Sequence, residues 1–154
     1  MSKTIRVQSA PFDVAAESES LTRGRTDIGA LVSFVGLCRD EAGTLSALEL
    51  EHYPGMAEAE LERIALEAES RWPLLGATIV HRVGRIAPGE PIVLVLTASA
   101  HRAAAFAAAE FLMDFLKSRA PFWKKEHRAD GGAGGWVAAK DADEAALERW
   151  ANKA

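Results

Sequence analysis

The segment from Ser99 to Lys117 constrains the fold of this chain more than any other. Its apolar residues recur at helical spacing and cover most of the circumference of a helix: Ala105, Phe106, Ala109, Leu112, Met113, Phe115 and Leu116. A surface helix carries a single apolar stripe, so a helix that is apolar nearly all round must be buried or lie at a contact between subunits. Ser99 is a residue type that caps helix starts, and Pro121 cannot continue a helix. We expect a long helix that begins at Ser99 and ends near Lys117 or Arg119.

The rest of the chain mixes strand and helix patterns without a regular alternation. Strands are expected at residues 4–8, 28–36, 45–53, 77–86, 92–97, 122–127 and 136–137, and helices at 14–21, 57–72 and 141–150. Asp13 is the expected cap of the first helix, and Pro73 stops the second. Residues 28–36 are β-branched and apolar on both faces, which predicts a central strand. The pattern predicts an α+β fold in a single domain, residues 1–154.

Length and composition exclude several classes of protein. A chain of 154 residues is long enough for one domain with its own core. It has no apolar run near the ~20 residues that span a bilayer, and residues 1–6 lack the apolar stretch of a signal peptide. The single cysteine cannot form an internal disulfide or a site built on several thiolates. We expect a cytoplasmic protein with no membrane contact, no metal and no cofactor.

The charge of the chain is unevenly distributed. The net charge is −4, which argues against a general nucleic-acid binder. Charged residues from Asp40 to Ser70 are almost all acidic, whereas Lys and Arg predominate from His101 to Arg128. One basic region on an acidic protein favours a small anionic ligand, although these cations could instead form a solvated face.

The basic region is densest in residues 117–126, where two lysines flank a helix stop and a Phe-Trp pair. Clustered cations disfavour one another's charge, and apolar walls add desolvation. One lysine of such a pair can act as a nucleophile or base while its neighbour binds an anion. The alternative is that Lys117 extends into water at a helix C-terminus, where the helix dipole favours a cation.

Two further stretches carry candidate groups. Ser99, His101 and Arg102 at a helix start combine free N–H groups, an imidazole and a guanidinium, which suits a phosphate; alternatively, Arg102 pairs with a surface acid. Cys38 follows an apolar strand and is interpreted as buried and unreactive. His81, on an alternating strand, is interpreted as structural.

These stretches carry a family resemblance. G-L-C-R at residues 36–39, E-H-Y-P-G-M at 51–56, S-A-H-R at 99–102 and K-S-R-A-P-F-W-K at 117–124 occur in this order and spacing. Together they resemble the large, catalytic subunit of molybdopterin synthase, over residues 12–150. The resemblance implies an α/β hammerhead fold with an additional antiparallel sheet, dimeric, with one ubiquitin-like small subunit at each end of a heterotetramer.

The resemblance also implies an activity and site residues. The small subunit brings sulfur as a C-terminal glycine thiocarboxylate, and two transfers to cyclic pyranopterin monophosphate give the dithiolene of molybdopterin. Lys117 would be the catalytic lysine and Lys124 its essential partner. Arg39, His101 and Arg102 would hold the substrate and its phosphate, and Leu37, Cys38, Lys125 and Glu126 would line the pocket. Lys140 departs from the family pattern, which often has an arginine there, and residues 131–135 form an unusually glycine-rich patch.

Other functions and arrangements stay open at this point. A non-catalytic adaptor would need the groove for a ubiquitin-like tail but not the lysine pair, and a phosphate-ligand sensor would need the anion site but no protein partner. An unbroken helix would separate His101 from Lys117 by roughly 24 Å, too far for one pterin monophosphate. Either the two motifs form separate sites, or His101 and Arg102 reach the Lys117 pocket of a neighbouring subunit; the apolar helix favours the second arrangement.

Overall fold

The computed structural model describes residues 1–40, 43–131, 133–137, 141–148 and 150–151, which form two four-stranded sheets and the helices around them. The strands are β1 (Ser2–Gln8), β2 (Ala30–Leu37), β3 (Leu45–His52), β4 (Leu74–Arg82), β5 (Gly84–Ile86), β6 (Pro91–Ser99), β7 (Phe122–Arg128) and β8 (Ala133–Val137). The helices are α1 (Val14–Thr22), α2 (Met56–Arg71), α3 (Arg102–Ser118) and α4 (Asp141–Glu148).

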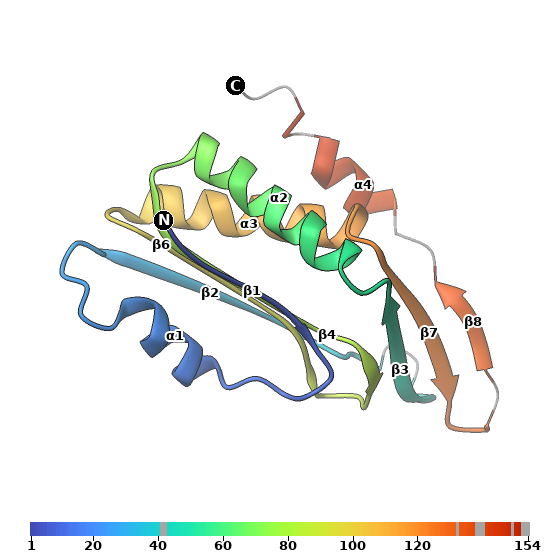
Figure 1. The fold of residues 1–154 in the computed structure, drawn as a ribbon. Helices are drawn as coiled ribbons and strands as arrows, with labels where there is room; N and C mark the ends of the chain where they lie inside the picture. Colours follow the sequence, from blue (N-terminus) through green and yellow to red (C-terminus); the bar gives the residue numbers. More distant parts are fainter. Residues whose placement is uncertain (41–42, 132, 138–140, 149, 152–154) are drawn as a thin grey trace.

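The first sheet has the order β1-β4-β6-β2 and carries the main core. β1 pairs with β4 in parallel, and the other two pairs are antiparallel. Helices α2 and α3 cover one face of this sheet and α1 covers the other, as Figure 1 shows. Alternating residues of β4 and β6 therefore pack into opposite layers: Ile79 and Val95 under α2 and α3, Val80 and Leu94 under α1.

The second sheet has the order β5-β3-β7-β8, is antiparallel throughout, and lies beyond one end of the first sheet (Figure 1). The expected α+β fold with an additional antiparallel sheet is confirmed. Several boundaries differ from those expected, and the largest change is at residues 77–86, which were expected as a single strand but are split between the two sheets. Gly84 has a φ of +87°, a left-handed conformation that turns the chain from β4 into β5.

The prediction of a central strand at residues 28–36 is wrong, because β2 is an edge strand of the first sheet. Within the described ranges it pairs with β6 alone, and three of its apolar side chains are exposed: Leu31 by 39%, Phe34 by 40% and Leu37 by 56%. An apolar pattern on both faces indicates burial of both faces, but it does not say whether the same chain provides the cover. Among the described residues, no strand pairs with the outer edge of β2, and these three side chains stay partly exposed.

The expected long helix is confirmed as α3, but its expected start is wrong. Ser99 is the last residue of β6, is almost fully buried, and donates its hydroxyl to the carbonyl of Pro73 at 2.8 Å. The cap position belongs to His101, whose side chain makes no capping hydrogen bond. Ser99 pairs with Ala30 and Leu74 in the sheet, and this strand pairing replaces the capping role. Most apolar residues of α3 are buried, yet Phe106 is 60% exposed.

None of the helices in the described ranges combines the length and the apolar character needed to cross a membrane.

Helix α2 offers a matched test of the main core. Leu61 is fully buried in that core, whereas Leu66 on the same helix is 49% exposed. We expect Leu61→Ala to lower the free energy of unfolding by about 2–5 kcal/mol, since it leaves a cavity. Leu66→Ala should change it by less than about 0.5 kcal/mol. Equal midpoints for the two variants in urea would contradict this placement of α2.

Candidate functional site

The two lysines of the 117–126 region lie on different elements that meet at one point. Lys117 is in the last turn of α3, and Lys124 is the third residue of β7. The connection is tight: the N–H of Arg119 donates to the carbonyl of Phe115 at 2.8 Å, and the N–H of Phe122 donates to that of Ala120 at 2.8 Å. The charges of both lysines act on the same buried imidazole, that of His81 on β4. Both lysines therefore lie near enough to His81 for their charges to lower its pKa, and one tight connection joins the elements that carry them.

The register of the second sheet determines which side chains accompany Lys124. Lys124 lies opposite Leu50, and Glu126 lies opposite Leu48. Residues directly opposite in a sheet share a face, and both leucines are buried against Cys38. Lys124 and Glu126 thus belong to the face that packs toward Cys38. Lys125 lies opposite Glu49 on the other face, so the structure does not bring it beside Lys124.

Cys38 and Arg39 follow β2 and are held by the turn that precedes β6. The N–H of Cys38 donates to the carbonyl of Glu90 at 2.8 Å, and the N–H of Gly89 donates to the carbonyl of Cys38 at 2.7 Å. These two bonds fix the backbone directly before Arg39, whose own side chain is exposed, as is that of Leu37.

That turn is itself tied to the first sheet. One carboxylate oxygen of Glu90 accepts from the N–H of Ala87 at 2.9 Å, and the other accepts from the guanidinium of Arg82 at 3.4 Å. Arg82 is buried and also donates to the carbonyls of Ser9 and Pro91 at 3.0–3.2 Å. A buried guanidinium satisfied in this way is a rigid anchor for the turn. The backbone that leads to Arg39 is therefore held both by β2 and, through the turn, by Arg82 of β4.

Cys38 is a poor nucleophile in this environment. It is 3% exposed, and its Sγ lies 3.9 Å from the carbonyl oxygen of Ile86. Burial raises the pKa of the Cys38 thiol, and the negative charges of Glu90, Asp40 and Glu126 raise it further. The thiolate is the reactive form of cysteine, so the structure supports the prediction that Cys38 is unreactive.

His101 and Arg102 lie at the opposite end of α3 from Lys117, and both are exposed. Because Ala30 pairs with Ser99 and Leu37 with Pro91, β2 runs antiparallel to β6, and α3 runs back along β6 in the direction of β2. Arg39 and Lys117 therefore share one end of the molecule, and His101 and Arg102 lie at the other. One chain does not bring the two motifs together.

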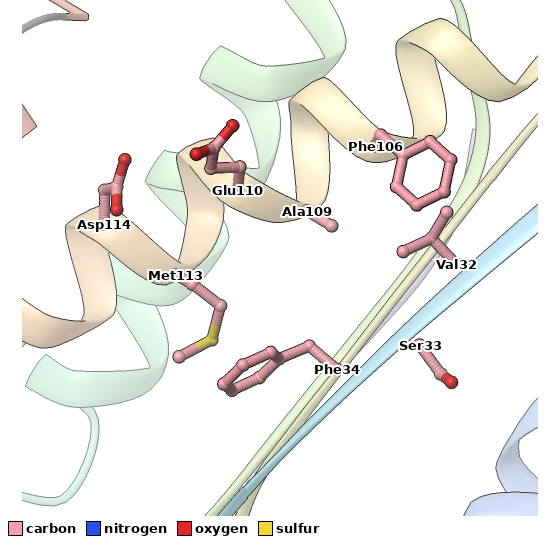
Figure 2. Close-up of a pocket in the computed structure, with 8 residues that line it drawn as sticks. All are labelled: Val32, Ser33, Phe34, Phe106, Ala109, Glu110, Met113 and Asp114. Atoms are coloured by element: carbon pink, nitrogen blue, oxygen red, sulfur yellow. The ribbon is translucent and has the colours of Figure 1, made fainter. Parts of the chain in front are cut away.

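A hollow of about 340 Å³ lies between β2 and α3, on the exposed edge of the first sheet. In Figure 2, Phe106 lies beside Val32, and Met113 points toward Phe34. The other lining residues are Ser33, Ala109, Glu110 and Asp114. The hollow is mainly apolar and continues the exposed edge of β2. Along α3 it extends from Phe106 to Asp114, between the end with His101 and the end with Lys117.

His81, interpreted from the sequence as structural, is buried and stacked on Phe122, and the sequence does not indicate this neighbour. The register of β4 with β1 and β6 places it in the sheet interior, at the end where the second sheet begins. The local sequence does not indicate which residues surround His81, because β1, β6 and β7, which contact it, are distant in the sequence. Lys140 lies outside the described residues. Within the described residues, no group of three or more His, Cys, Asp or Glu could hold a metal ion.

The burial of Cys38 is directly testable. We expect the folded protein to react with an aromatic disulfide reagent at neutral pH at least about tenfold more slowly than the protein in denaturant, since the thiol is covered and its pKa is raised. Cys38→Ala provides the blank for the assay. A folded protein whose thiol reacts as fast as the denatured one would contradict the burial seen here.

Comparison with known proteins identifies the family. A family model described as "MoaE protein" matches residues 7–119. A "Molybdopterin synthase catalytic subunit" from Mesorhizobium japonicum is 69% identical over 150 residues, covering 97% of this chain and 94% of the relative. One from Rhizobium meliloti is 67% identical over 150 residues, covering 97% of each chain.

Solved structures agree with this assignment. The MoaE protein from Burkholderia ambifaria superposes with a TM-score of 0.84 at 52% identity, covering 99% of this chain and 100% of that one. A molybdopterin synthase structure from Staphylococcus aureus gives a TM-score of 0.77 at 32% identity, covering 85% of this chain and 94% of that one. The matched lengths, the identities and the shared fold lead to one conclusion: this chain belongs to the MoaE family.

Proposed function

We propose that this chain is the sulfur-transferring subunit of a molybdopterin synthase. The sulfur would come from the thiocarboxylated C-terminal glycine of a ubiquitin-like small subunit. The acceptor would be cyclic pyranopterin monophosphate, and the product the dithiolene of molybdopterin. The observation that supports the proposal is that Lys117 at the end of α3 and Lys124 on β7 are joined by one tight connection, in which Phe122 stacks on the buried ring of His81. The names of the related catalytic subunits support the same reaction.

The two lysines suit a reaction between two anions. A thiocarboxylate and a phosphate ester both carry negative charge, and they repel each other as they approach. Ammonium groups between them reduce that repulsion and stabilise the charge that develops during transfer. In this proposal Lys117 acts at the reacting atoms, and Lys124 holds the anionic tail of the small subunit. Arg39 lies at the same end of the molecule and would bind the substrate.

The phosphate-binding pair of this proposal, His101 and Arg102, would come from a second copy of the chain. An isologous dimer formed along β2 and α3 places the two copies antiparallel when its two-fold axis is perpendicular to these elements, because such an axis reverses their direction. The partner's helix start then lies beside the Lys117 end of the first copy. The exposed apolar side chains of β2, the exposed Phe106 and the hollow between β2 and α3 supply the surface that such a contact would bury.

Two small subunits would complete a heterotetramer, one at each end of this dimer.

Two other functions would use parts of the same surface: an adaptor that binds the ubiquitin-like tail, and a sensor of phosphate ligands. Neither requires two lysines at one site, so the placement of Lys117 and Lys124 on the two elements joined by this tight connection supports the enzyme. We also propose that the protein acts in the cytoplasm, where a buried free thiol such as that of Cys38 stays reduced. Cell fractionation tests this.

The enzyme proposal predicts a separation of chemistry from binding. Lys117→Ala should lower formation of molybdopterin from thiocarboxylated small subunit and pterin precursor by about 10²–10⁴-fold. The thermal midpoint should stay nearly constant, since Lys117 is exposed at a helix end. Binding of the small subunit, measured by calorimetry, should persist. Arg23→Ala, which removes an exposed cation at the end of α1, is the matched control.

Near-normal turnover in Lys117→Ala would rule out the catalytic assignment. A wild-type protein that binds the small subunit but makes no molybdopterin would favour the adaptor.

The shared site predicts complementation between inactive variants. A His101→Ala/Arg102→Ala variant and a Lys117→Ala variant, refolded together, should form heterodimers with one intact composite site. Each heterodimer should regain up to about half of the wild-type activity, since one site in two is complete. Each variant refolded alone is the control. If mass spectrometry proves heterodimers but no activity returns, each chain builds its own site.

A further inference from the structure

One ring stack joins the first sheet to the start of β7. The imidazole of His81 on β4 lies flat against the ring of Phe122, with centroids 3.8 Å apart and planes inclined by 10°. Phe122 also stacks with His52, its register partner on β3, at a centroid distance of 6.2 Å. Phe122 is the first residue of β7, two positions before Lys124, and it follows the tight turn at the end of α3. The ring of Phe122 is therefore fixed where the chain passes from one lysine to the other.

The imidazole of His81 is itself held rigidly. The ring is 7% exposed, and its Nδ1 lies 2.8 Å from the carbonyl oxygen of Arg82. A carbonyl only accepts hydrogen bonds, so Nδ1 donates and carries the proton of the neutral ring. Arg82 is in turn anchored by the carbonyls of Ser9 and Pro91. The ring cannot turn without breaking a buried hydrogen bond.

The electrostatic surroundings keep this ring neutral. Burial is the main reason that the pKa of His81 is lowered to about 4; the hydrogen bond with the Arg82 carbonyl opposes this shift, and the charges of Lys124, Lys117 and His52 add to it. A carboxylate in this place would form ion pairs with the lysines, and a second cation would repel them. A neutral aromatic ring does neither, so it can support the lysine pair without neutralising its charge.

We propose that His81 is a positioning residue for the lysine pair: its ring fixes Phe122, and through Phe122 the path of the chain from Lys117 to Lys124. The proposal deepens the proposed function and rests on it for the role of the lysines. His81 touches neither substrate in this arrangement and exchanges no proton during the reaction.

The decisive comparison is between His81→Ala, which removes the ring, and His81→Phe, which keeps a flat neutral ring but has no nitrogen. We expect His81→Ala to lower kcat by about 10–100-fold with little change in KM, because a misplacement near 1 Å has effects of this size. His81→Phe should stay within about threefold of the wild type, since the stack is retained. Circular dichroism confirms that each variant is folded at the assay temperature.

A second measurement does not depend on turnover. Lysines of the free protein are acetylated competitively across a pH range, and the labelling rate of Lys124 is compared with that of Lys3, which lies on β1. His81→Ala should change this ratio several-fold, and His81→Phe should leave it unchanged. If the wild type makes no molybdopterin, the proposed function fails, while the labelling ratio still tests the role of His81.

Three results would overturn the proposal. The first is wild-type kcat and labelling in a folded His81→Ala. The second is a folded His81→Phe as impaired as His81→Ala, since a ring nitrogen would then be required. The third result concerns Phe122→Leu, which breaks the same stack from β7 and is used if His81→Ala does not fold. An unchanged labelling ratio in folded Phe122→Leu would contradict the proposal.

Discussion

The packing of α3 across the first sheet is the constraint on which the rest of the structure depends. The buried face of α3 shares a core with Val93 and Val95 of β6 and with Ile79 of β4, so the helix must run back along β6. β2 also runs antiparallel to β6, and the two elements therefore point the same way. This single relation places Lys117 at the end where Arg39 leaves the sheet, and His101 at the other end. The separation of the cationic motifs follows from core packing.

The register of the second sheet determines on which of its two faces each charged side chain of β7 lies. Its antiparallel register puts Lys124 and Glu126 opposite two buried leucines, and Lys125 opposite Glu49. A shift of one residue would exchange these faces, because side chains alternate along a strand. The register is held by the burial of Leu48, Leu50 and Ile86 against Cys38. The role of Cys38 in this structure is thus one of packing, which its raised pKa supports.

Local sequence patterns were sufficient to predict the elements but not their neighbours. The helical spacing of Leu61, Ile64 and Ala68 identifies α2, and Asp13 caps α1 by accepting from the N–H of Ala16 at 3.1 Å. Periodicity reports which face is apolar, and it is silent on what covers that face. For this reason β2 was misjudged as a central strand, and Ser99 as a helix cap.

In the candidate site, too, residues within one local motif could be predicted, whereas contacts between distant segments could not. Lys117 and Lys124 could be proposed from the sequence because they lie within one short motif. His81 could not, because its position beside them depends on the register of β4 with β1 and β6 and on the crossing to β7.

The exposed edge of β2 links assembly to activity. An apolar edge strand with unpaired backbone groups promotes aggregation, and natural proteins cover such edges or interrupt them with charges. From Leu31 to Leu37 this strand carries no charged residue. In the proposed dimer the contact that covers β2 is also the contact that brings His101 and Arg102 to Lys117. A substitution that weakens this contact would therefore expose the edge of β2 and also separate His101 and Arg102 from Lys117. Selection for activity and selection against aggregation would then act on the same few apolar side chains.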